Sequence, residues 1–171
     1  MLTASIGCEP RDLEPPTRGE CGELTESFFR KFSIGEKMAK FNDFNIEKQY
    51  AIYICGNQRE HPPTLYLAEA FAKEGEPVVS FLTGKLSATK SDSTVRDIIS
   101  VFSDMQNLKT YDVASNEILM AIIVNRAAGI KDDFWRGYTQ NLVAEIKAAA
   151  PRHGVERRHG VSAAKRTRAE Q

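Results

Sequence analysis

The sequence lacks the features that usually reveal an enzyme or a membrane protein. Its 171 residues contain one tryptophan, three cysteines and three histidines, and no run approaches the roughly 18 apolar residues that a membrane-spanning helix needs. A phosphate-binding loop, a dinucleotide-binding glycine motif, a zinc-protease motif, an esterase serine motif and an EF-hand loop are all missing. We therefore predict no catalytic residues, no metal site and no cofactor, and we favour a non-enzymatic protein.

The chain as a whole carries no excess of positive or negative charge, but its C-terminal end is basic. The 23 basic and 23 acidic residues give a formal net charge of zero. After Pro151, however, six basic residues face only two acidic ones, so we predict that residues 151–171 form a basic, disordered tail. Basic tails attract nucleic acid. No aromatic side chains stand among these bases to stack on nucleobases, which makes nucleic acid the less favoured partner.

The N-terminal residues resemble the end of a bacterial lipoprotein signal. Gly7-Cys8 matches the pair at the lipidation site, and the proline-rich, charged residues 9–20 are similar to the tether that spaces a folded domain from its anchor. The resemblance implies lipidation of Cys8, residues 1–23 as a tether, and a place on the periplasmic side of the bacterial cell envelope. Ser5 stands where the family usually has leucine, and no basic or long apolar region precedes the cysteine. A chance Gly-Cys pair in a cytoplasmic protein is the alternative.

Cysteine count gives a second indication of an oxidising compartment. If Cys8 carries lipid, Cys21 and Cys55 remain as a pair that can form a disulfide. The alternative is that Cys55 is a free, buried side chain on an apolar helix. No C-x-x-C pair occurs, so thioredoxin-like redox chemistry and a zinc ribbon have no support.

Apolar side chains recur at three- and four-residue spacing through residues 24–150, which predicts an all-α domain. The pattern is clearest over 76–105, where Pro77 opens one helix and the turn at 91–93 caps the next, as in an antiparallel hairpin. For 46–58 a buried strand is the alternative, but no second strand-like segment exists to pair with it. Further helices are predicted over 24–32 with Thr25 as a cap, over 64–73, after Ser115 or Asn116, and after Asp132 or Asp133.

For two sets of side chains on these helices we predict whether they are buried or exposed. Trp135 and Tyr138 belong to the apolar stripe of the last helix, so we expect them to pack against the core. Trp135 would instead be a partner contact if its face is exposed. Asp97 and Asp104 are expected on the solvated side of the second hairpin helix.

Short helices that restart after Gly-Glu-Pro, Ser-Asp-Ser and Asp-Asp turns resemble the HEAT-like α-helical repeat family. The resemblance covers residues 64–146 and rests on Glu76-Pro77-x-x-x-x-Leu82 followed by a second amphipathic helix. It implies stacked antiparallel helical hairpins that present a surface to another protein. An irregular helical bundle is the alternative.

The polar loop that follows residue 58 is the strongest candidate for a binding loop. Our leading hypothesis is a protein-interaction domain that acts as an adaptor or scaffold, with an envelope lipoprotein as its setting. One alternative is a cytosolic helical protein that binds nucleic acid through its tail. Another is a hydrolase, because a carboxylate beside an imidazole, as in Glu60-His61, can serve as a general base. The predicted partner-binding residues are Arg59, Glu60, His61, Tyr66 and Trp135.

Overall fold

The computed structural model describes residues 15–149, and no strand occurs among them. The all-α prediction is therefore confirmed, and residues 46–58 lie in a helix rather than a strand. The elements in chain order are α1 (Arg18–Leu24), a π-helical turn η2 (Thr25–Phe29), α2 (Ile34–Phe41), α3 (Ile46–Arg59), α4 (Tyr66–Ala72), α5 (Glu76–Ala88), α6 (Asp92–Leu108), α7 (Glu117–Ala128) and α8 (Asp133–Ala148).

The later helices begin where the sequence supplies good N-cap residues. Ser91, Asn116 and Asp132 each accept a hydrogen bond from the backbone N–H three residues further on, which starts α6, α7 and α8. Helix α5 begins differently, with Pro77 in its first turn, where the missing N–H costs no hydrogen bond. These local signals explain why the helix starts were predictable.

The first helix begins earlier than we predicted. Thr17 and Glu20 form a reciprocal capping box, in which each side chain binds the other residue's backbone N–H, so α1 starts at Arg18. The C-terminal part of the segment 1–23, expected to be a tether, is therefore helical. Thr25 is not an N-cap, because it ends α1: its backbone N–H binds the Cys21 and Gly22 carbonyls, and its hydroxyl donates to the Glu60 carboxylate.

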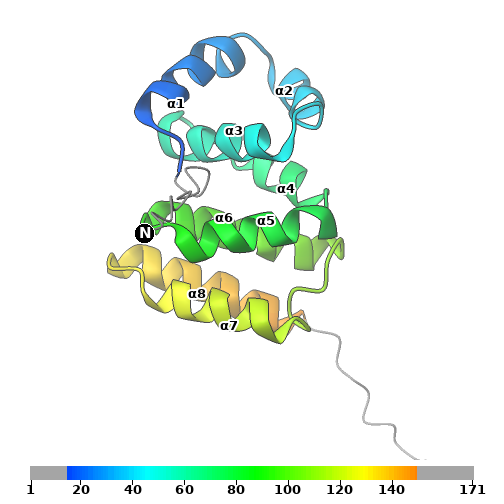
Figure 1. Ribbon diagram of the computed structural model, residues 1–171, viewed down its shortest axis with the longest axis vertical. Helices are drawn as coiled ribbons and strands as arrows, with labels where there is room; N and C mark the ends of the chain where they lie inside the picture. The colour runs from blue at the N-terminus through cyan, green and yellow to red at the C-terminus, as the bar shows by residue number, and fades with distance from the viewer. Residues whose placement is uncertain (1–14, 150–171) are drawn as a thin grey trace, which may run out of the picture.

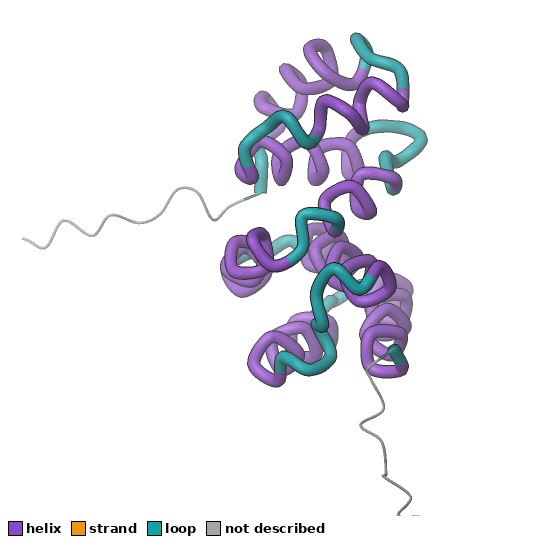
Figure 2. Tube along the Cα trace, turned by 90° about the vertical axis from the view of Figure 1, so that its right-hand side faces the viewer, coloured by secondary structure: helices purple, strands orange, loops and turns teal. Residues whose placement is uncertain are grey.

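Helices α3 to α8 lie in two rows and three layers (Figure 1). One row holds α3, α5 and α7, and the other holds α4, α6 and α8, with contacts from α4 to α6, from α6 to α8 and from α5 to α7. The rings of Tyr50 and Phe81 join α3 to α5, with centroids 5.6 Å apart. Figure 2 shows the α5–α6 and α7–α8 pairs nearly end-on, one pair stacked on the other. Each layer is a pair of consecutive helices, and α5–α6 is the hairpin predicted over 76–105.

Large aromatic side chains and a disulfide hold the upper layers together. Phe41, Tyr53 and Phe71 are fully buried and meet edge to face, with ring centroids 5.7 and 6.0 Å apart. Cys21 and Cys55 form a disulfide that joins α1 to α3, as predicted. The N-terminal helices are thus covalently attached to the stack as well as packed on it.

One glycine fixes the turn between α4 and α5. Gly75 has a φ of 67°, and a Cβ at this position would lie 2.9 Å from the Thr110 carbonyl oxygen. The Thr110 hydroxyl also donates to the Ala72 carbonyl, at 2.7 Å. The turn can therefore lie directly against the C-terminal end of α6 only because this residue has no side chain.

Several predictions concern residues that the structure does not describe. Lipidation of Cys8 and the basic tail of residues 151–171 both lie outside residues 15–149. Within the described residues, no helix is both long enough and apolar enough to cross a membrane.

Asp104 of α6 is more buried than its predicted place on a solvated helix face implies. Burial, followed by the negative charge of Glu69 on α4, raises the pKa of the Asp104 carboxyl to about 6. The folded chain therefore favours the protonated form more than the unfolded chain does. This contribution to stability is fully present below pH 4 and is lost as the pH rises through 6.

We expect Asp104→Asn to be more stable than the unchanged chain at pH 7 and equally stable below pH 4. Because part of this carboxyl faces water, solvent screening limits the expected gain to about 1 kcal/mol. Urea unfolding of both proteins at pH 3.5, 5 and 7 measures the difference. Asp43→Asn, on an exposed carboxylate between α2 and α3, is the matched control. A stability difference that does not grow between pH 4 and pH 7 would contradict this assignment.

Candidate functional site

Three exposed aromatic rings gather on the first two turns of α8, and we call them the α8 aromatic cluster. Phe134, Trp135 and Tyr138 have 70%, 38% and 45% of their surface exposed. The Trp135 ring meets Phe134 and Tyr138 edge to face, with centroids 4.9 and 6.1 Å apart. Our expectation that Trp135 and Tyr138 pack into the core is wrong, because the buried side of α8 is made by Thr139, Val143 and Ile146.

The local sequence explains why these rings stand together. Asp132 caps α8 by accepting from the Trp135 backbone N–H at 2.9 Å, so the helix begins directly before the aromatic residues. Residues 134, 135 and 138 then fall on one side of the helix, because positions three and four apart are neighbours on its surface.

Arg96 of α6 supports the cluster from beneath. Its guanidinium carbon lies 4.3 Å from the centre of the Trp135 ring, a cation–π contact. The same guanidinium binds the Asp97 carboxylate, with its Nε at 2.9 Å and its second nitrogen at 2.6 Å from one oxygen. The Arg96 side chain is 15% exposed and that of Asp97 only 3%. Trp135 therefore rests on a cation that a buried carboxylate holds in place.

A buried polar network connects Asp97 to the C-terminal end of α3. The Gln58 amide donates to the other Asp97 carboxylate oxygen at 2.8 Å and to the Thr94 hydroxyl at 3.2 Å. The Tyr53 hydroxyl donates to the Asp97 backbone carbonyl at 2.7 Å. The network spans α3 and α6 and ends under the α8 aromatic cluster.

Burial dominates the electrostatics of this network. It raises the pKa of Asp97 above the usual range, although Arg96 and the hydrogen bond from Gln58 act in the opposite direction. Burial also raises the pKa of the Tyr53 hydroxyl, so this group stays a hydrogen-bond donor over the whole neutral range. Our expectation of a solvated Asp97 is wrong, because its partners come from a helix distant in the sequence.

The predicted binding loop lies at the same end of the molecule as the cluster. The C-terminal end of α3 and the N-terminal ends of α6 and α8 share one side of the stack in Figure 1. Gln58 contacts α6, Asp92 of α6 accepts from the Lys131 backbone before α8 at 2.9 Å, and Arg96 contacts Trp135. The loop and the cluster are thus linked through the N-terminal half of α6.

The four other predicted partner-binding residues lie outside the aromatic cluster, each in a different environment. Arg59 and His61 are exposed. The Glu60 carboxylate accepts from the Thr25 hydroxyl at 2.6 Å, which ties the loop to the N-terminal helices. Tyr66 is partly buried, and burial together with the Glu60 charge raises the pKa of its hydroxyl. Of the five predicted partner-binding residues, the structure places only Trp135 in the aromatic cluster.

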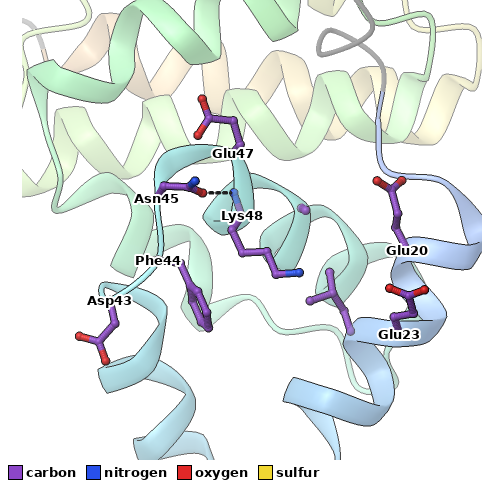
Figure 3. A pocket seen from close by; sticks show the side chains of 9 residues that line it. Glu20, Glu23, Asp43, Phe44, Asn45, Glu47 and Lys48 are labelled. Carbon is purple, nitrogen blue, oxygen red and sulfur yellow. Dashed lines mark hydrogen bonds between the residues drawn. The ribbon is translucent and has the colours of Figure 1, made fainter.

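A hollow of about 590 Å³ lies between α1 and the start of α3 (Figure 3). Leu24, Phe44 and Ala51 line it together with one cation and four carboxylates, namely Lys48, Glu20, Glu23, Asp43 and Glu47. The Thr17 backbone and hydroxyl bind Glu20 and lower its pKa, and Asn45 caps α3 by accepting from the Lys48 backbone at 3.0 Å. Two of the polar side chains in this hollow thus serve the helix starts, and its negative charge disfavours anionic ligands.

Phe134, Tyr138 and Arg96 are contributors to the site that sequence reasoning did not identify. The sequence marks Phe134 and Tyr138 by several aromatic residues directly after a helix cap, whereas the position of Arg96 depends on tertiary packing.

Among residues 15–149, no group of three or more His, Cys, Asp or Glu side chains is arranged to hold a metal ion. Comparisons of this chain with protein families, with curated proteins and with solved structures found no match.

Proposed function

We propose that this chain is a non-enzymatic helical domain that binds another protein through the α8 aromatic cluster. The observation that carries the proposal is the exposure of three adjacent rings on a rigid support. Aromatic side chains dominate the binding energy of protein interfaces, because they bury a large area with little loss of conformational freedom. Arg96 and Asp97 fix the central ring before any partner arrives, which lowers the entropy cost of binding.

The loop after α3 is proposed as the polar rim of this surface. Arg59 ends α3, His61 follows it, and both are exposed. This end of α3 lies on the same side of the stack as the N-terminal end of α8 (Figure 1). Interfaces commonly surround an apolar centre with polar groups that remain partly hydrated. The loop would then contribute to specificity, and the rings to affinity.

Our proposal for the setting is the bacterial envelope, with the domain acting as an adaptor or scaffold. The Cys21–Cys55 disulfide supports it, because structural disulfides persist in oxidising compartments and are rare in the cytosol. The paired rows of α3 to α8 support the proposal of HEAT-like stacking. A lipid on Cys8 would hold the domain at the membrane surface.

Site-specific photo-crosslinking in cells that express the chain tests the proposed surface. We expect p-benzoyl-phenylalanine at position 134 to give a discrete adduct with another protein, because that side chain points outward at the edge of the cluster. The same residue at position 34, an exposed apolar position on α2, is the matched control. Trp135→Ala should reduce the adduct at least tenfold, as expected for the loss of about 2 kcal/mol at an interface centre. No adduct, or equal adducts at both positions, would refute the proposed surface.

A further inference from the structure

The last layer of the stack leaves an apolar face uncovered. Helix α7 packs on α5 and α8 packs on α6, and no helix among residues 15–149 covers the other side of this pair. On that side α7 exposes 39% of Val124. Stacked helical proteins normally end in a polar outer face, because the terminal layer has no further layer to cover its outer side.

Shallow, mostly apolar hollows run along the uncovered face. Two adjoining hollows of about 710 and 250 Å³ lie along α7 and α8. Their apolar lining comes from Met120, Ala121, Val124, Ala127, Ala128, Val143 and Ala144. Small side chains dominate this lining, so the backbone of another helix can approach closely.

One acidic and one basic side chain stand at the same end of this face. Glu117, at the start of α7, and Lys147, near the end of α8, both line the larger hollow. Neither forms an ion pair within the described part of the chain. A partner suited to this face therefore offers a basic group opposite Glu117 and an acidic group opposite Lys147.

We propose that a second copy of this chain covers the α7–α8 face, as a two-fold symmetric dimer. Helices α7 and α8 run antiparallel, so a two-fold axis parallel to them and between them places α7 of one copy on α8 of the other. Glu117 then faces Lys147 of the second copy, and the symmetry repeats the pair. The same operation sets the stripe of Ala121, Val124 and Ala128 against Val143 and Ala144. In this arrangement the face satisfies its own charge requirement.

The length of α7 and α8 limits the size of the proposed interface. Helices α7 and α8 contain 12 and 16 residues, so at 1.5 Å per residue the shared face is about 20 Å long. A face of this length is at the small end for a specific interface, which buries about 1,200 to 2,000 Å² in total. We expect a dimer with a dissociation constant in the micromolar range.

Sedimentation equilibrium of the full chain between about 1 and 200 µM tests the dimer, because this range brackets a micromolar dissociation constant. The unchanged chain should dimerise, and Val124→Glu should be monomeric. Its far-UV circular dichroism spectrum should stay the same, and so should its melting temperature when both chains are measured well below the dissociation constant. Leu65→Glu is the control. Leu65 lies on another face and is more exposed than Val124, so the chain with this substitution should still dimerise.

A charge exchange tests the pairing itself. Glu117→Lys and Lys147→Glu should each weaken the dimer about tenfold, because each places two pairs of like charges together. The double variant Glu117→Lys/Lys147→Glu should recover the original affinity. A chain that is monomeric throughout, or a double variant no better than the single ones, would overturn the proposal. Faster amide exchange in residues 117–128 after deletion of residues 150–171 would assign the face to the tail and overturn it too.

Discussion

Loss of the Cys21–Cys55 disulfide is expected to lower the free energy of unfolding by about 4 kcal/mol. The two cysteines are 34 residues apart, and closing a loop of that length removes conformational entropy from the unfolded chain. Both side chains are buried, so alanine fills the sites without burying an unpaired polar group. Urea unfolding of Cys21→Ala/Cys55→Ala measures the loss.

Two further measurements test whether the loss of stability comes from the Cys21–Cys55 disulfide. Cys8→Ser leaves the disulfide intact and should unfold at the same urea concentration as the unchanged chain. In the double alanine variant, amide exchange should accelerate most in residues 18–29, because α1 and η2 are then held to α3 only by packing and by the hydrogen bond from Thr25 to Glu60. A loss below about 1 kcal/mol would show that the disulfide does not hold the N-terminal helices to the stack.

Arg96→Met is expected to cost about 3 to 5 kcal/mol at pH 7, because it leaves the buried Asp97 carboxylate without its cation. The pKa of Asp97 is already raised by burial in the folded chain, so its ionisation opposes folding. Lowering the pH protonates this carboxyl, and the difference between variant and unchanged chain should therefore shrink as the pH falls. Urea unfolding at several pH values measures this dependence.

The double variant Arg96→Met/Asp97→Asn distinguishes an unpaired charge from a loss of packing. With no carboxylate left to neutralise, we expect it to be more stable than Arg96→Met alone. Arg96→Lys keeps the charge but not the planar stack on Trp135, so it should preserve more stability than methionine while altering the Trp135 fluorescence. If Arg96→Met costs the same at every pH, the Asp97 charge does not explain the loss.

Local signals in the sequence were sufficient to predict most of the fold. Helix caps at Ser91, Asn116 and Asp132 and the proline at 77 mark helix starts, and apolar spacing marks the buried sides. The Cys21–Cys55 disulfide was predicted from the count of three cysteines and the resemblance of Cys8 to a lipidation site, with a free buried Cys55 as the alternative. The start of α1 was missed because its capping box lies in a stretch that is otherwise charged and rich in proline.

The candidate site was harder to predict, because it depends on contacts between distant segments. Asp97 resembles an ordinary surface carboxylate in the sequence, yet Gln58 and Tyr53 reach it from 39 and 44 residues away. Trp135 and Tyr138 match a core stripe by spacing, yet α8 buries another side. A helical pattern identifies which residues share a face, but not which face the neighbouring helices cover.

Fluorescence of Trp135 offers the most direct test of the proposed binding surface. It is the single tryptophan of the chain, so its emission and its quenching by acrylamide report on this one position. We predict that the protein captured by crosslinking at position 134, when added to the unchanged chain, shifts the emission to shorter wavelength and reduces quenching. Complex formation with no change in either signal would show that the partner binds elsewhere and would contradict the account.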